Sequence, residues 1–173
     1  TYDGVAMVEM WDASMAPDNP AMAHAGYRLA GQAAGAKVAT NTLTAGPQWH
    51  SFGVVSMTGV DQTTPVGTPV VIIGVGDLSV TVGAVGVDDL VVDGLWKNDT
   101  AAPTIGPDQT LRNTEDPEAT LFFRSSTQPG TAGGVMSWTT TGSFTGGLGA
   151  VAVKPSAAAV AAGAGIGPLM LGA

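Results

Sequence analysis

The stretch Asp77-Leu78-Ser79-Val80-Thr81-Val82-Gly83 alternates apolar and polar residues. In an extended strand this order places Leu78, Val80 and Val82 on one face and the polar residues on the other. Such a pattern is typical of a strand that has one face buried and the other in contact with water. The fold is therefore expected to be built from half-buried β-strands.

Similar patterns recur along the chain, separated by turn residues. The 173 residues include 25 glycines and 11 prolines, 45% are apolar, and only 12% are charged. Gly and Pro are disfavoured inside helices and common in turns. Strands are expected at 5–10, 27–29, 37–44, 51–60, 78–82, 90–96, 110–112, 119–125, 135–140 and 148–154, and a strand or extended loop at 69–73. The strand at 51–60 is apolar on both faces, which predicts a central, buried position.

The number and spacing of these strands predict an all-β fold. Short strands with turns between them favour an antiparallel β-sandwich, with a jelly roll as the preferred version. The length suits one domain with a real core. We place the β-sandwich domain at 1–155 and an apolar Ala/Gly-rich C-terminal tail at 156–173.

The tail at 156–173 has no charged side chain. Three glycines and Pro168 interrupt it, and alanine and glycine contribute little transfer energy, so no membrane span is expected. Two interpretations stay open: a flexible tail, or a segment that docks in a groove on this or a neighbouring subunit. The docking residues would be Ile166, Leu169, Met170 and Leu171.

Charge limits the classes of partner. Fourteen acidic residues against six basic ones give a net charge of −8. A negative surface repels phosphate backbones and anionic lipid, so we expect neither nucleic acid nor a membrane as a partner. The chain has no cysteine, which excludes disulfides, thiolate nucleophiles and zinc–thiolate sites.

Candidate catalytic and metal-binding residues are few. The two histidines, His24 and His50, have no Gly-x-Ser-x-Gly motif beside them. Acidic residues gather in two groups: Asp88, Asp89 and Asp93, and Glu115, Asp116 and Glu118. Neither group fits a calcium-loop pattern, so both are expected to form turns and to solubilise the chain. We predict no catalytic residue, no metal site and no cofactor.

Aromatic residues give the best candidate for ligand binding. The four tryptophans would form a sugar-stacking platform if they were exposed together. Trp96 and Trp138 lie in strong strands and are predicted to be core residues. Trp49 lies at a junction between loop and strand, and with Gln48 and Asp61 it forms the predicted ligand-binding set.

Six segments follow one another in a familiar order: 1–7, 56–67, 89–93, 109–112, 136–139 and 150–155. The most specific part is Gly59-Val60-Asp61-Gln62-Thr63-Thr64-Pro65, within the second segment. This order resembles that of a loosely defined group of β-sandwich domains, which recur in tailed-phage structural proteins and in large bacterial surface proteins. The resemblance implies a non-catalytic building or binding module and supplies no catalytic residues.

The first functional hypothesis is a virion structural protein, such as a capsid decoration, fibre or minor tail component. It would act by assembly with copies of itself and with other virion proteins. The alternative is an extracellular or cell-surface module for carbohydrate binding or adhesion, with a surface glycan as partner. A glycan hydrolase or lyase would need two carboxylates, or a His/Tyr/Arg cluster, in a groove, and the few charged residues disfavour it.

Overall fold

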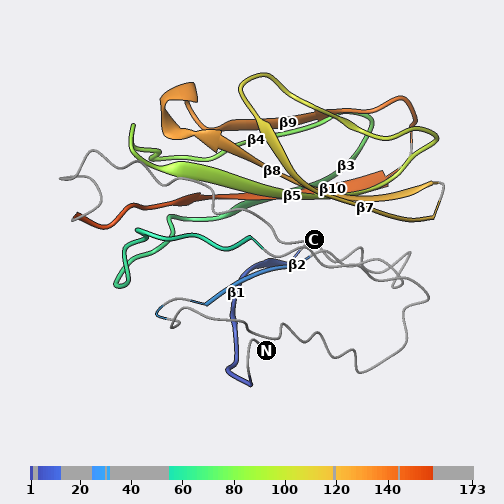
Figure 1. Ribbon diagram of the computed structural model, residues 1–173. Coiled ribbons are helices and arrows are strands. Elements are labelled where there is room, and N and C mark those ends of the chain that lie inside the picture. The colour runs from blue at the N-terminus through green and yellow to red at the C-terminus, as the bar shows by residue number, and fades with distance from the viewer. Residues whose placement is uncertain are drawn as a thin grey trace.

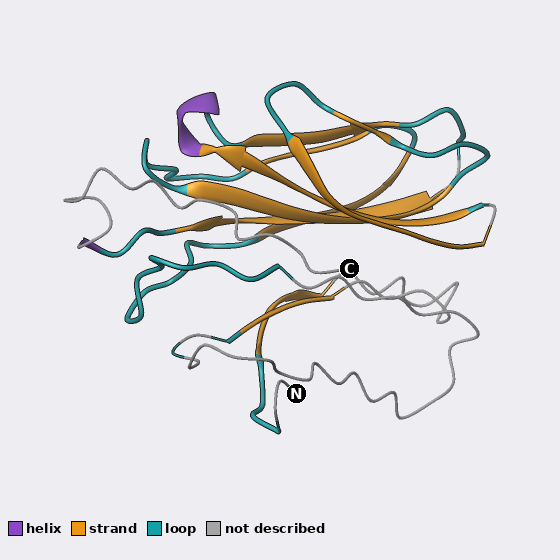
Figure 2. Ribbon diagram, in the orientation of Figure 1, coloured by secondary structure: helices purple, strands orange, loops and turns teal. Residues whose placement is uncertain are grey.

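The computed structural model describes residues 1, 4–12, 25–29, 31, 55–118, 120–143 and 145–157. Within these ranges two antiparallel β-sheets face each other, and a third, two-stranded sheet lies on the far side of the larger one (Figure 1). Figure 2 shows that strands make up most of both layers. The prediction of an all-β antiparallel sandwich is confirmed.

The larger sheet has five strands in the order β3-β10-β5-β8-β7. Their bounds are β3 Val70–Val75, β10 Thr145–Val153, β5 Leu90–Asn98, β8 Leu121–Pro129 and β7 Thr110–Glu118. The smaller sheet has the order β4-β9-β6, with β4 Leu78–Thr81, β9 Val135–Thr139 and β6 Thr104–Ile105. The two-stranded sheet pairs β1 Val8–Asp12 with β2 Ala25–Arg28. A 3-10 turn, Gly130–Ala132, follows β8.

The chain crosses repeatedly between the two main sheets. It passes from β3 to β4, back to β5, across to β6 and back to β7, and among the described strands of these two sheets only β7 and β8 are consecutive strands of one sheet. Each crossing closes part of the core, so residues distant in sequence become neighbours. The jelly-roll version of the prediction also involves strands outside the described residues, and it stays a prediction.

The core lies between the five-stranded and three-stranded sheets. Leu78 and Val80 are buried while Ser79 and Thr81 are exposed, which confirms the alternation predicted for this strand. Trp138 on β9 is also buried in this layer, as expected. The remaining buried members come from both sheets: Val82, Val91, Leu95, Met136, Leu148, Ala150 and Ala152.

The outer face of the five-stranded sheet carries two indoles on glycines. A Cβ atom at Gly149 of β10 would overlap the ring of Trp11, which belongs to β1. A Cβ atom at Gly147 would overlap the ring of Trp96 on the neighbouring strand β5. Both indoles are buried, so the expected burial of Trp96 is confirmed, although on the face opposite Trp138. The glycines of β10 therefore allow the two rings to lie flat on the sheet.

The predicted central strand at 51–60 is wrong for its described part. Residues 55–60 form no strand and make only isolated bridges, one of which joins Val60 to Pro155. Gly59 has a φ of 71°, a left-handed conformation that interrupts an extended chain. The backbone here runs beside the end of β10, where Asp61 N donates to Lys154 O at 3.0 Å. β3 pairs with β10 only over Thr145–Ala150, and beyond it residues 60–67 border the same edge through isolated bridges, so the segment lies at the rim of the sheet and not at its centre.

Two weak predictions near 110–125 understated the strands. The expected strands at 110–112 and 119–125 are two nine-residue strands, β7 and β8. The acidic residues at 115–118, predicted to form a turn, are instead the end of β7. Their pairing with β8 outweighs the local turn signal of Pro117, which is tolerated because β7 is an edge strand.

Replacing Gly149 with valine should weaken the attachment of the β1–β2 sheet. The added side chain would occupy the position of the Trp11 ring, so we expect a loss of about 1–3 kcal/mol in the free energy of unfolding. Urea unfolding followed by tryptophan fluorescence measures this loss. Gly83→Ala is the control, because a Cβ atom there meets nothing within 4 Å. Equal stability of the two variants would contradict the assigned packing.

Candidate functional site

A buried polar network joins the two main sheets around Asp93. The strand β5 directs this carboxylate into the core, where it is almost fully buried. Asp93 Oδ1 accepts hydrogen bonds from Ser126 N at 2.6 Å and from Ser126 Oγ at 2.8 Å. Asp93 Oδ2 accepts from Trp138 Nε1 at 2.7 Å. Ser126 lies on β8 and Trp138 on β9, so the carboxylate accepts hydrogen bonds from both main sheets and links them.

Gln109 extends this network toward the three-stranded sheet. Its Nε2 donates to Ser126 Oγ at 2.8 Å and lies 3.4 Å from Asp93 Oδ2. Its Oε1 accepts from Ser137 N at 2.8 Å. Burial raises the pKa of Asp93 to about 7, although the hydrogen bonds from Trp138 and Ser126 lower it in part.

A second polar group lies at the end of β5. Lys97 is buried, and its Nζ donates to Gly76 O at 3.0 Å, in the turn between β3 and β4. Burial lowers the pKa of Lys97, while Asp99 and Asp77 act in the opposite direction. Asp99 Oδ1 accepts from Thr100 N at 2.6 Å. Burial raises the pKa of Asp99, but the hydrogen bonds that it accepts outweigh burial and hold this pKa below its usual value.

The acidic residues grouped in the sequence are separated in the fold. Asp88 is exposed, Asp89 accepts from Gly86 N at 2.9 Å, and Asp93 belongs to the core. Asp116 pairs with Arg124 at 2.8 Å. Over the described ranges, no three His, Asp or Glu side chains form a group that could hold a metal ion.

The two edges of the five-stranded sheet differ in charge. At one edge, β3 is composed only of valine, isoleucine and glycine, and its exposed apolar side chains are Val71, Ile72, Ile73 and Val75. At the other edge, β7 includes Arg112, Glu115, Asp116 and Pro117, and its register with β8 shifts twice. Charge, proline and bulges are the usual means by which a sheet edge is protected from pairing with another chain. Among the strands that the structure describes, β7 is thus a protected edge, whereas β3 has none of these protective features.

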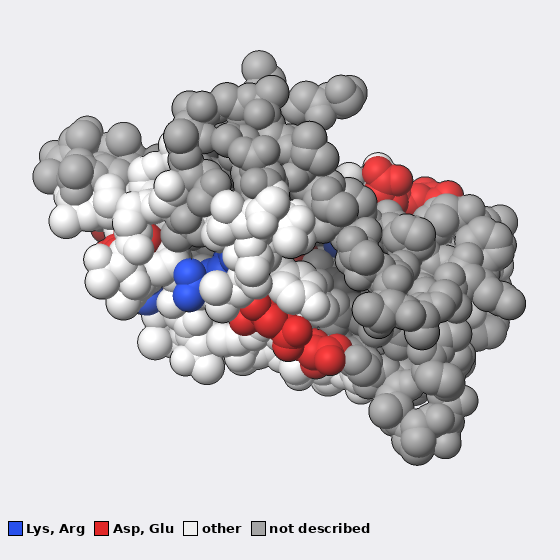
Figure 3. Space-filling model, turned by 90° about the horizontal axis from the view of Figure 1, so that it is seen from below, with Lys and Arg blue, Asp and Glu red and all other residues white. Residues whose placement is uncertain are grey.

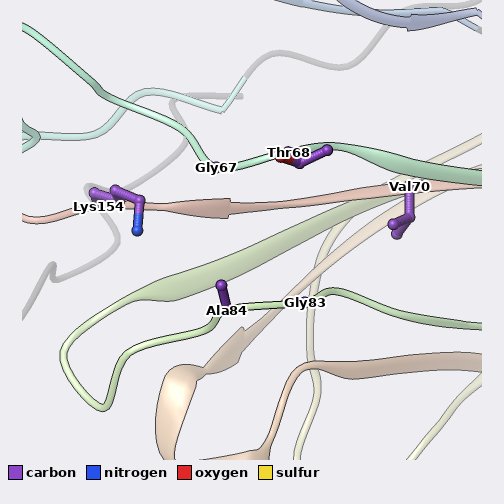
Figure 4. A pocket seen from close by; sticks show the side chains of 6 residues that line it. All are labelled: Gly67, Thr68, Val70, Gly83, Ala84 and Lys154. Carbon is purple, nitrogen blue, oxygen red and sulfur yellow. The ribbon is translucent and has the colours of Figure 1, made fainter.

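A shallow hollow of about 490 Å³ opens at one end of the sandwich (Figure 4). Its lining residues are Gly67, Thr68, Val70, Gly83, Ala84 and Lys154. Lys154 Nζ forms an ion pair with Asp89 Oδ2 at 3.7 Å. The lining offers one charged group and one hydroxyl, which is no constellation for acid–base or nucleophilic catalysis.

Asp61 is the one predicted ligand-binding residue that the structure describes. Its Oδ1 accepts hydrogen bonds from Thr63 N at 2.7 Å and Thr64 N at 2.9 Å, so the carboxylate holds its own loop. These two bonds lower its pKa. Trp49 and Gln48 lie outside the described residues, as do both histidines and the predicted tail contacts Ile166, Leu169, Met170 and Leu171. Of the other tryptophans, Trp11, Trp96 and Trp138 are all buried and form no exposed platform.

Sequence reasoning missed the polar groups of the interior and the character of the β3 edge. Asp93 was grouped with its sequence neighbours, although its place within a valine-rich strand is the signal that could have marked it as buried. Val70–Val75 has no charged residue, which is the corresponding signal for an unprotected edge. No helix in the described part of the chain has the length and apolarity to span a membrane.

The pKa of Asp93 predicts a specific pH dependence of stability. The folded state binds the Asp93 proton up to about pH 7, whereas an unfolded aspartate releases it near pH 4. Between these values the free energy of unfolding should therefore fall as pH rises, by at most about 1.4 kcal/mol per pH unit from this group. Urea unfolding at several pH values tests the prediction.

Asp93→Asn provides the comparison. The variant should lose this pH dependence. At neutral pH its free energy of unfolding should be lower by about 1–3 kcal/mol, because the N–H groups of the new amide would face hydrogen-bond donors where the Asp93 carboxylate accepts them. If both proteins show the same slope between pH 4 and 7, the assignment to Asp93 is wrong.

Comparisons with protein-family models, with curated proteins and with solved structures give no match.

Proposed function

We propose that this chain is a non-catalytic structural protein of a virion, such as a capsid decoration, fibre or minor tail component, and that it acts through assembly. The observation that supports assembly is the unprotected β3 edge of the five-stranded sheet. The virion setting rests on the resemblance of the segment at 59–65 and of its companion segments to β-sandwich domains that recur in tailed-phage structural proteins and in large bacterial surface proteins. Its partners are other copies of itself and other virion proteins.

The β3 edge suits assembly for a physical reason. A terminal strand has backbone N–H and C=O groups that can pair with another strand, and exposed apolar side chains add burial on contact. Val75 is 63% exposed, and Val71, Ile72 and Ile73 are also exposed. A chain with this edge and with a charged opposite edge has one direction in which its sheet can be extended.

The distribution of charge supports the same proposal. The net charge of −8 keeps free particles apart in solution. On the face seen in Figure 3, the acidic side chains of the described residues gather in a few groups, and basic and uncharged residues are visible beside them. Contacts between neighbouring subunits can therefore form at uncharged surface while the acidic clusters stay in water.

The alternative, a carbohydrate-binding or adhesion module, stays a prediction. It needs an exposed aromatic ring beside polar groups. Of the candidate residues that the structure describes, Trp11, Trp96 and Trp138 are buried. The Asp61 carboxylate accepts hydrogen bonds from the backbone of its own loop. The alternative therefore depends on Trp49 and Gln48, which lie outside the described residues.

Placing a charge on β3 tests the proposed assembly. Val71→Lys should shift the assembled protein toward monomers, because the lysine cannot be desolvated at an apolar contact. Light scattering and sedimentation velocity measure the mass. Val87→Lys is the matched control, since Val87 is 71% exposed in a loop and the same charge is added there. A mass that is unaffected by Val71→Lys, or affected equally by both variants, would count against assembly through β3.

A further inference from the structure

We propose that the β3 edge pairs with β3 of a second copy of this chain, in antiparallel register about a two-fold axis at Ile73. This inference rests on the proposed function and names the partner at the edge. The result would be one continuous sheet in which the five strands of each copy are joined through their β3 strands.

Charge favours a second copy as the partner. The segment Val70–Val75 has no charged residue, so pairing two copies of it brings no like charges together. The charged edge β7 is four strand spacings away, or about 19 Å. This exceeds the Debye length of about 8 Å at physiological ionic strength, so acidic residues of β7 are screened from the contact. The acidic residues of β7 therefore do not oppose pairing at β3.

The two faces of the sheet restrict how two copies can pair. Residues directly opposite each other in an antiparallel pair point to the same face. A two-fold axis normal to the sheet preserves the faces, so the numbers of paired residues must have an even sum. Val71 and Ile73 lie opposite Gly149 and Gly147 of β10, on the outer face with the two indoles. Ile72 lies opposite Leu148, on the inner face.

Side-chain size then favours the register centred on Ile73. In this register Val71 lies opposite Val75 of the second copy, and Ile73 lies opposite Ile73. On the inner face Ile72 lies opposite Gly74, which has no side chain to obstruct it. Each exposed apolar side chain of β3 thus lies opposite an apolar side chain or a glycine of the second copy. Inside one copy, Val71 and Ile73 lie opposite glycines of β10 and have no side chain directly across from them.

A contact confined to one strand from each copy is small. Stable interfaces usually bury about 1,200 Å² or more, so the free dimer should depend on concentration and be reinforced by neighbours within an assembly. Cross-linking detects such a contact better than chromatography. The absence of cysteine makes the chain well suited to this test, since every introduced thiol is unique.

Single-cysteine variants test both the partner and the register. Under mild oxidation Ile73→Cys should form a disulfide dimer at least tenfold faster than Val87→Cys, which has an exposed loop position. Val71→Cys alone should not exceed the Val87→Cys rate, because its copies would lie about 13 Å apart along the strand. An equimolar mixture of Val71→Cys and Val75→Cys should give the mixed dimer.

The possible results separate this inference from the proposed function. Equal rates for Ile73→Cys and Val87→Cys, in a wild-type protein that light scattering shows to be oligomeric, would overturn self-pairing at β3 and leave assembly through another strand or segment. Fast dimerisation of Ile72→Cys in place of Ile73→Cys would overturn the register. A wild-type protein that stays monomeric at high concentration and forms no cross-links would overturn both proposals.

Discussion

The hydrogen bond from Trp138 Nε1 to the Asp93 carboxylate joins the two main sheets at 2.7 Å, and the surrounding packing has to be compatible with it. Apolar contacts are non-directional, so on their own they would allow one sheet to slide over the other. A buried carboxylate that loses its donors is far more costly than a shifted methyl group. Ser126 and Gln109 therefore have to stay in place as well. We infer that this network fixes how the two sheets are aligned, while the apolar core supplies most of the stability.

The glycines of β10 are the second constraint. Gly147 and Gly149 have no side chains on the outer face, and the rings of Trp96 and Trp11 occupy the space above them. The same two glycines are the cross-strand neighbours of Ile73 and Val71 on β3. The packing that attaches the β1–β2 sheet and the outer-face side chains of β3 therefore meet at the same two positions of β10.

Local patterns predicted the parts of the fold that depend on local order. The alternation at Leu78 and Val80 identified β4 and its buried face, and the apolar strand around Trp96 identified β5. Prediction failed where the partner decides the outcome. An apolar segment such as 55–60 becomes central only if strands pair with it on both sides, and the backbone that follows it meets only the end of β10, through isolated bridges. The interior position of Asp93 depends in the same way on donors from Ser126 and Trp138, 33 and 45 residues away in sequence.

The buried Lys97 connects the interior to the β3 edge. Its Nζ donates to Gly76 O, in the turn through which β3 passes to β4 in the opposite sheet. The turn is therefore held at its centre by a group on β5, and Val70 at the start of β3 packs against the core. A strand that is fixed at both ends and paired along β10 loses little further conformational freedom when another strand binds it. Its edge is consequently preorganised for pairing, and this partly compensates for the small area that a single strand can bury.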